Sequence, residues 1–151
     1  MKNDNNKFTP YRLIPLITSR IWGGSTLTKS MHLDTEDLHP GEIIACGGIE
    51  GRDTRIYGLN QPLSEFFKNN RDYFNLKHEV FPLTLNLIDT NEPLSIQVHP
   101  TEEYAQRVEH CCGLHEAWLV LDSKENAELI AGHSAKTKTA LLESFQSCNY
   151  Y

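Results

Sequence analysis

A short stretch in the middle of the chain alternates strictly between apolar and polar residues. Its sequence is Leu94-Ser95-Ile96-Gln97-Val98-His99. A period of two is typical of a β-strand with one buried face and one polar face. Pro100 follows at once and cannot continue a central strand, because proline has no backbone N–H to donate. The pattern predicts a half-buried strand over residues 94–100 that ends where it presents the imidazole of His99.

A second apolar stretch begins at Glu116 and runs to residue 121. It predicts another strand, with a carboxylate at its start. A neutral histidine nitrogen and a carboxylate oxygen are both zinc ligands, and a zinc ion with an open position polarises hydroxyl and carbonyl oxygens. His99 and Glu116 are therefore candidate metal ligands. The alternative is a hydrogen-bonded structural histidine and a solvated turn carboxylate, because these ligands alone do not complete a zinc site.

Further short strands are predicted along the chain. An apolar run closed by glycines over residues 41–48 indicates a buried strand, and alternation over residues 81–89 indicates another. The turn sequence Asn91-Glu92-Pro93 then predicts a hairpin between the strands at 81–89 and 94–100. A last strand is expected over residues 127–131.

The predicted helices are short. One begins near residue 63 with Ser64 as its N-cap, one covers residues 101–105 with Thr101 as its cap, and an amphipathic helix covers residues 137–145. Many short strands with a few short helices favour a mainly β fold, a double-sheet or jelly-roll architecture with helical decorations.

Composition limits the partners of the chain. Its 151 residues suit one domain, predicted over residues 10–151 after a disordered polar tail at residues 1–9. The net charge of −6 and the absence of a run of Lys or Arg argue against nucleic acid and against an anionic membrane as partners. No apolar stretch approaches the roughly 20 residues of a membrane span. The N-terminus has no apolar signal region, so a cytoplasmic location is expected.

The four cysteines are expected to be reduced in that compartment. They are Cys46, Cys111, Cys112 and Cys148. Cys111, Cys112 and His115 could form a zinc site, but they lack the paired Cys-x-x-Cys spacing of structural zinc sites. Small thiols in a loop are the favoured interpretation.

Several stretches together resemble a known family. Over most of residues 11–133, their order and spacing resemble the N-terminal portion of type I phosphomannose isomerases, the zinc-dependent mannose-6-phosphate isomerases of the cupin superfamily. The stretches are Ile21-Trp22-Gly23-Gly24, Gly41-Glu42, Phe81-Pro82-Leu83 with Ile88-Asp89, the block at 94–105, and Glu116-Ala117-Trp118-Leu119-Val120-Leu121-Asp122. The strand-to-helix block at 94–105 is the most specific of them.

The resemblance implies a fold, a reaction and a metal site. The fold is a cupin-type jelly roll, and the substrates are D-mannose 6-phosphate and D-fructose 6-phosphate, interconverted through an enediol. One Zn²⁺ per site is implied, with Gln97, His99 and Glu116 as ligands. Ser95, on the same polar face, is expected to contact the substrate.

The chain also departs from the family pattern. It ends at Tyr151, before the strand that supplies a further histidine ligand in the family, so an incomplete barrel with an open sheet edge is expected. Asn86 stands where the family usually has a lysine, and Gly113-Leu114-His115-Glu116 lacks another. Weak or no isomerase activity of the chain alone is predicted, together with a complementing chain or self-association through the open edge. The alternatives are a non-catalytic cupin module that binds a sugar phosphate or a metal, and an inactive remnant.

Overall fold

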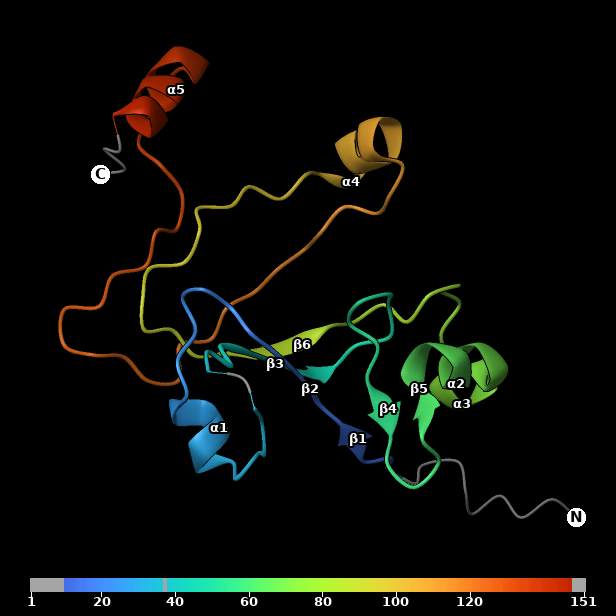
Figure 1. Cartoon of the computed structure of the whole chain (residues 1–151). Helices are drawn as coiled ribbons and strands as arrows, with labels where there is room; N and C mark the ends of the chain where they lie inside the picture. Colours follow the sequence, from blue (N-terminus) through green and yellow to red (C-terminus); the bar gives the residue numbers. More distant parts are fainter. Residues whose placement is uncertain (1–9, 37, 148–151) are drawn as a thin grey trace, which may run out of the picture. The chain divides into compact units, whose positions relative to one another are not determined.

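The chain divides into two compact units, and each is described by itself. The computed structural model describes residues 10–36 and 38–147, and the units are Met1–Leu94 and Ser95–Tyr151. Figure 1 shows the elements in chain order. The predicted tail at residues 1–9 and Cys148 lie outside the described residues. Whether the two units together make the predicted domain at 10–151 stays a prediction.

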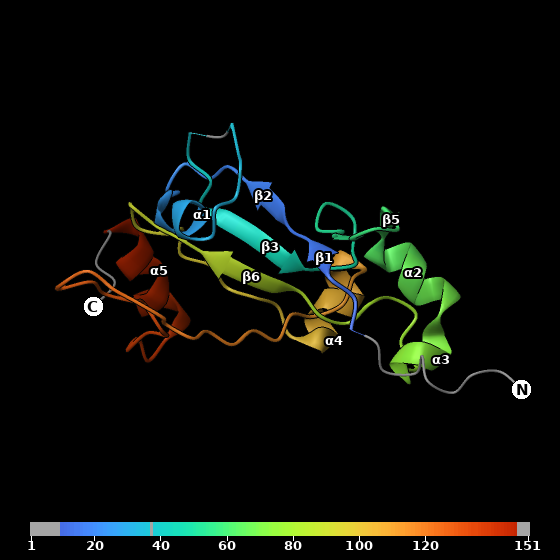
Figure 2. The same ribbon diagram turned by 90° about the horizontal axis from the view of Figure 1, so that it is seen from below.

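The core of the first unit is a three-stranded antiparallel sheet. Its strands are β2 (Leu16–Thr18), β3 (Glu42–Cys46) and β6 (Leu85–Ile88), with β3 in the centre, as Figure 2 shows. The prediction of a buried strand within 41–48 is confirmed, since Ile43 and Ile44 are buried. A strand within 81–89 is also confirmed, although it pairs with β3 and not with residues 94–100.

The first unit also contains a second small sheet and a cluster of aromatic side chains. Its antiparallel strands are β1 (Leu13–Ile14), β4 (Arg55–Ile56) and β5 (Gln61–Pro62). The helices α2 (Leu63–Asn69) and α3 (Arg71–Phe74) follow β5 directly. Rings in the cluster meet edge to face, an arrangement worth about 0.5–1.5 kcal/mol per pair beyond area burial. The cluster contains Tyr11, Phe66, Phe67, Tyr73, Phe74 and Phe81.

The predicted helix near residue 63 is confirmed as α2, but Ser64 is not its N-cap. The cap position is Pro62, and Ser64 lies inside the first turn. Its backbone N–H donates to Oδ1 of Asp53 at 3.0 Å, and its hydroxyl donates to Oδ2 of the same carboxylate. A residue of the preceding loop therefore caps this helix, which a pattern local to residue 63 does not reveal.

A buried carboxylate ties the central strand to its flanks. Glu42 is buried in β3 and contacts Arg20, Arg52 and the hydroxyl of Thr18. Both guanidinium groups remain partly exposed. Because a buried charge is costly unless it is paired, these contacts compensate the burial of Glu42.

The Trp22-Gly23-Gly24 turn brings two backbone segments into direct contact. A Cβ on Gly41 would lie 2.4 Å from the Cα of Gly23 and 2.8 Å from the Trp22 ring, so both positions require glycine. Next to the turn, the carboxylate of Asp89 accepts from the backbone N–H of Leu27 at 2.8 Å in the first turn of α1 (Thr26–Ser30).

The second unit contains helices and extended segments. The helices are α4 (Glu102–Tyr104), the π-helical turn η2 (Ala105–Glu109) and α5 (Lys138–Gln146). Thr101 caps α4 and Thr137 caps α5, each accepting a backbone N–H. The predicted helices at 101–105 and 137–145 are confirmed. No helix in the described parts of the chain is long and apolar enough to cross a membrane.

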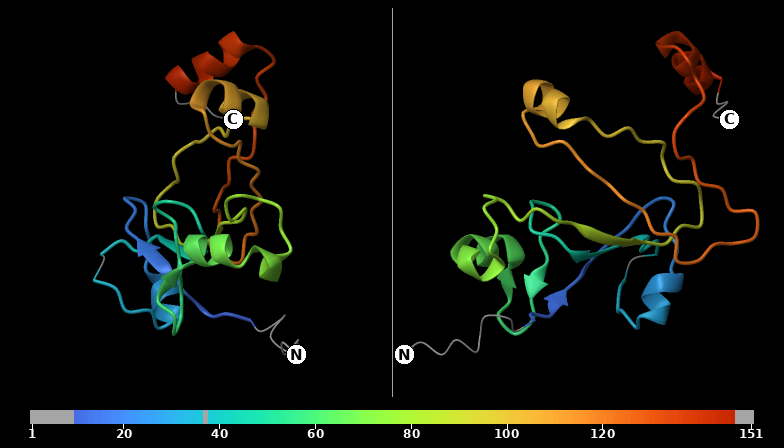
Figure 3. Two further views of the ribbon diagram at one scale, coloured as in Figure 1. Left: turned by 90° about the vertical axis from the view of Figure 1, so that its right-hand side faces the viewer. Right: turned by 180° about the vertical axis from the view of Figure 1, so that it is seen from behind.

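The strands predicted at 94–100, 116–121 and 127–131 are wrong as paired strands. Residues 95–147 contain no strand and no β-bridge, and Figure 3 shows long runs without arrows on either side of the gold helical turn. A strand needs a neighbour that exchanges backbone hydrogen bonds with it. Among the described residues these segments have no such neighbour. The mainly β jelly roll is accordingly seen only in part, as small antiparallel sheets with short helices.

Candidate metal centre

His99 and Glu116 lie against each other in the second unit. The Nε2 atom of His99 is 2.9 Å from Oε2 of Glu116, and the two side chains are 32% and 40% exposed. An imidazole and a carboxylate are thus presented together at a surface that solvent reaches. The distance is that of a hydrogen bond or an ion pair.

A backbone closure positions this pair. His99 precedes α4, and Glu116 lies in the segment that leaves η2. The backbone N–H of Gly113 donates to Oε2 of Glu102 at 2.7 Å, and a Cβ on Gly113 would lie 2.5 Å from the backbone N of Glu102. His99 lies as far before Glu102 as Glu116 lies after Gly113. The segments on either side of the closure therefore carry the imidazole and the carboxylate to the same place.

Gln97 and Ser95 form a second polar pair in the same unit. The amide nitrogen of Gln97 donates to the hydroxyl of Ser95 at 2.9 Å. The oxygen of the Gln97 amide is the atom that can bind a metal ion, and it is not the atom engaged with Ser95. Gln97 as a ligand and Ser95 as a substrate contact stay predictions.

The donor atoms of His99 and Glu116 fit one small cation. Two ligands of a tetrahedral zinc ion, each about 2.1 Å from the metal, lie about 3.4 Å apart. The observed 2.9 Å is shorter by about half an ångström, which a small rotation of two partly exposed side chains can supply. A zinc site needs at least one further protein ligand. Among residues 10–36 and 38–147, no three side chains of His, Cys, Asp or Glu gather closely enough to hold a metal ion.

The alternative cluster of Cys111, Cys112 and His115 does not gather into such a site. Cys111 and Cys112 are exposed free thiols. They follow η2, where His110 ends the helical turn in the left-handed region.

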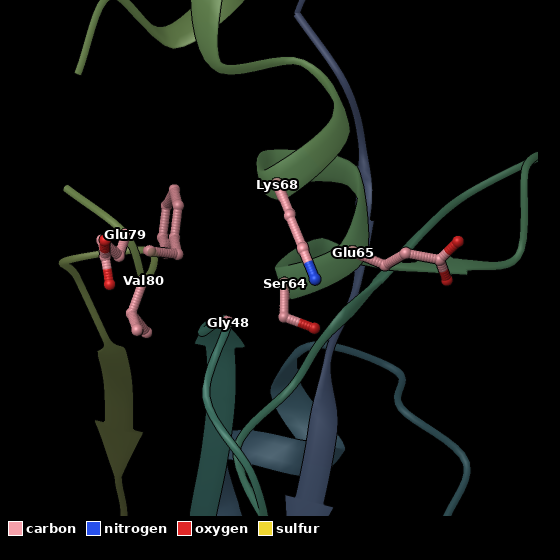
Figure 4. A pocket seen from close by; sticks show the side chains of 7 residues that line it. Gly48, Ser64, Glu65, Lys68, Glu79 and Val80 are labelled. Atoms are coloured by element: carbon pink, nitrogen blue, oxygen red, sulfur yellow. The ribbon is translucent and has the colours of Figure 1, made fainter. Parts of the chain in front are cut away.

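A shallow cavity of about 350 Å³ lies in the first unit, and none of the predicted site residues lines it. Figure 4 shows Lys68 and Ser64 extending from α2 on one side of the opening and Glu79 and Val80 on the other. The Ser64 hydroxyl is engaged by Asp53. The cavity lining also carries two carboxylates besides the Lys68 ammonium. Its complete lining is Gly48, Ser64, Glu65, Lys68, Glu79, Val80 and Phe81.

Sequence reasoning missed the contact that brings the candidate ligands together. The interaction of Glu102 with Gly113 depends on a turn through η2 that the sequence pattern does not specify. A weak signal was present, since Gly113 follows the predicted helix closely, although the helical turn itself ends at His110.

Comparison with known proteins gives a consistent result. No family model matches the chain. It is 38% identical to a mannose-6-phosphate isomerase of Streptococcus mutans over 127 residues, which cover 81% of the chain and 40% of that relative. It is 34% identical to the putative mannose-6-phosphate isomerase YvyI of Bacillus subtilis over 144 residues, which cover 92% of the chain and 46% of that relative.

A solved structure agrees with these relatives. The mannose 6-phosphate isomerase of Bacillus subtilis matches with a TM-score of 0.88 and 31% identity, over 95% of this chain and 47% of that one. These likenesses confirm the predicted resemblance in both sequence and backbone. The chain spans slightly less than half the length of the relatives that it matches.

Proposed function

We propose that this chain, which is homologous to the mannose-6-phosphate isomerases, carries part of the active site of a zinc-dependent aldose–ketose isomerase. The reaction is the interconversion of D-mannose 6-phosphate and D-fructose 6-phosphate. The observation that carries the proposal is the contact of His99 with Glu116 at 2.9 Å, because it places a nitrogen and an oxygen ligand together in a chain of this ancestry.

The chemistry of the reaction explains the choice of residues. Isomerisation removes a proton next to a carbonyl and passes through an enediol, so negative charge develops on a substrate oxygen. A bound zinc ion supplies a Lewis acid for that oxygen. His99 and Glu116 would hold it, with the amide oxygen of Gln97 as a weaker neutral ligand. Before a metal ion binds, the Glu116 carboxylate orients the imidazole of His99 through their direct contact.

The hydroxyl of Ser95 is proposed to contact the substrate. It already accepts a hydrogen bond from the Gln97 amide, so its position is linked to that of a proposed ligand. A hydroxyl can donate to a sugar or phosphate oxygen while it accepts this bond. Asn86, in β6, cannot supply the positive charge that a lysine would offer a phosphate or an enediolate.

The complete fold is proposed to be a cupin-type jelly roll, of which this chain forms part. We expect low isomerase activity of the chain alone. At 32% and 40% exposure, His99 and Glu116 lie where water screens electrostatic interactions, whereas catalysis of this kind depends on a site that excludes water. The same exposure supports a second candidate, a module that binds a metal or a sugar phosphate without turnover.

Metal content tests the proposal directly. The purified full chain is loaded with zinc, dialysed and analysed by plasma mass spectrometry, alongside His99→Ala and, as a matched control, His78→Ala. His78 is exposed in the first unit, outside the candidate site. Zinc bound by the wild type and His78→Ala, but not by His99→Ala, supports the metal centre. The metal centre would be overturned if all three chains held the same amount of zinc, or if none of them held any.

Substrate binding and turnover separate the two candidates. The zinc-loaded chain is heated with mannose 6-phosphate, with mannose, and with inorganic phosphate. Stabilisation by mannose 6-phosphate alone indicates a sugar-phosphate site, because a ligand raises the stability of the state that binds it. A coupled assay of the chain alone should show little turnover. A rate constant in the usual range of about 1–1,000 s⁻¹ would contradict that expectation and identify the chain as a competent enzyme.

A further inference from the structure

The extended segments of the second unit expose apolar side chains that their sequence pattern would bury. Val98 is 82% exposed and Leu119 is 80% exposed. The neighbouring side chains Trp118, Val120 and Leu121 are exposed as well. Successive residues of an extended chain point to opposite faces, so both faces of the segment at 118–121 are uncovered. A continuous apolar run of this kind is typical of a strand that is covered on both faces.

These segments also carry unused backbone hydrogen-bonding groups. Within residues 95–147 no strand or bridge pairs with them. An extended, apolar and unpaired segment is a template onto which another strand can add. The exposed side chains and the unpaired backbone therefore indicate the same kind of partner. It is a β-strand that pairs with these segments, together with protein that covers their apolar faces.

The likeness to a solved isomerase indicates what that neighbour is. The match covers 95% of this chain, so it includes most of the second unit, but it covers only 47% of the isomerase. The backbone of the extended segments therefore resembles the matching backbone of a protein that is about twice as long. The conformation of these segments is therefore suited to pairing with the part of the isomerase fold that this chain does not match.

A second copy of this chain fits less well. It would bring the same segments, and a two-fold pairing of 116–121 with itself would satisfy one edge of each segment. The apolar side chains on the faces would still lack a covering layer. Covering both faces requires strands that this chain, within its described residues, does not have.

We propose that residues 95–99 and 116–121 form a docking edge for the complementary half of an isomerase fold, a β-rich polypeptide that adds strands to them and buries Val98 and Leu119. Docking converts the unpaired segments into sheet. It also surrounds His99 and Glu116 with protein on the side now open to solvent. The proposal concerns assembly, and it does not depend on zinc binding or on isomerase activity.

The test co-expresses this full chain with the part of the Bacillus subtilis mannose 6-phosphate isomerase that the chain does not match. Size-exclusion chromatography with light scattering should give a one-to-one complex. Hydrogen exchange of the amides at 95–99 and 116–121 should slow in the complex. Val98→Lys and Leu119→Lys should each weaken it at least about tenfold, because each would bury an unpaired charge. Both side chains are exposed in the free chain, so these substitutions leave its folding intact.

Ile21→Lys is the matched control, since Ile21 is 97% exposed in the first unit. It should leave the complex unchanged. A chain that stays alone, forms only homodimers, or loses the complex equally with Ile21→Lys would overturn the proposal. If the added polypeptide does not fold by itself, it is linked to this chain through a flexible peptide. Exchange at 116–121 must then slow in the linked protein, and unchanged exchange there counts against the docking edge.

Discussion

Gly113 and Glu102 close a loop by direct contact, with the backbone N–H of Gly113 donating to the Glu102 carboxylate at 2.7 Å. The closure leaves no room for a side chain on Gly113, because a Cβ there would lie 2.5 Å from the backbone N of Glu102. The segments that lead away from it carry His99 and Glu116. The separation of the proposed ligands therefore depends on a glycine that contacts neither of them.

Gly113→Ala should consequently weaken zinc binding without removing a ligand. The added methyl group forces the two backbone segments apart and disturbs the 2.9 Å contact between His99 and Glu116. Loss of an interaction that orients metal ligands commonly costs about 10–100-fold in affinity, and a change within that range is expected here. Competition with a chromophoric chelator measures it. Leu114→Ala, at the next and exposed position, is the control and should bind zinc like the wild type.

Glu116→Gln tests the charge of the proposed site while keeping its shape. The amide still contacts His99, but it no longer contributes a negative charge to a cation. Zinc affinity should fall by at least about tenfold, with little change in the melting temperature, because both side chains are partly exposed. Glu103→Gln, an exposed carboxylate nearby in sequence, should have no such effect. Equal losses in both variants would indicate a general effect of net charge.

The parts of the structure that were predicted from sequence depend on local patterns. β3 was predicted because a short apolar run closed by glycines is typical of a buried strand. Ile43 and Ile44 in this run are indeed buried. The predicted cap Thr101 bonds to a backbone N–H within the same helical turn. Such contacts are encoded within a few residues, so one sequence suffices to predict them.

The parts that were not predicted depend on partners far away in the chain. Alternation in residues 94–99 gives the faces of an extended segment, but not which strand pairs with it, and β6 in fact pairs with β3. The cap of α2 comes from Asp53, outside the helix. In the candidate site, His99 and Glu116 were chosen from residue type and family resemblance. Their contact follows from the closure at Gly113, and a distance of that kind does not follow from sequence alone.

Asp53→Ala should destabilise the first unit by about 1–2 kcal/mol, because it removes both bonds that cap α2. Ser64→Ala should cost less, since it removes the hydroxyl bond and keeps the bond from the backbone N–H. Urea unfolding followed by circular dichroism measures the free energy of unfolding for both variants and the double mutant. Both substitutions remove the same hydroxyl bond. The free energy of unfolding of the double mutant should therefore lie within a few tenths of a kcal/mol of that of Asp53→Ala. Additive costs would contradict this capping role.

Gly41→Ala should disrupt the turn at Trp22 and destabilise the unit by about 3 kcal/mol or more. The new methyl group meets the Cα of Gly23 at 2.4 Å, and neither backbone can move without shifting the other. Hydrogen exchange should accelerate at Asp89, whose N–H donates to the carbonyl oxygen of Gly41. Gly51→Ala is the control. It places a methyl group in open space at a φ of +74°, so it should cost about 1–2 kcal/mol and leave exchange at Asp89 unchanged.

Cys46, at the end of β3, should react slowly with iodoacetamide in the folded chain. Burial raises the pKa of its thiol, and only the thiolate is nucleophilic. Alkylation should therefore be several-fold slower in the folded chain than in urea, as measured by mass spectrometry of the peptide that contains Cys46. The ratio of the two rates should have its full, constant value at every pH below the ordinary thiol pKa and should shrink as the pH rises above it, because the folded thiol then ionises as well. Exposed Cys111 and Cys112 report in the same sample that the reagent is active. A ratio that does not change with pH would assign the slow reaction to restricted access alone, because shielding by neighbouring atoms does not depend on the thiolate fraction.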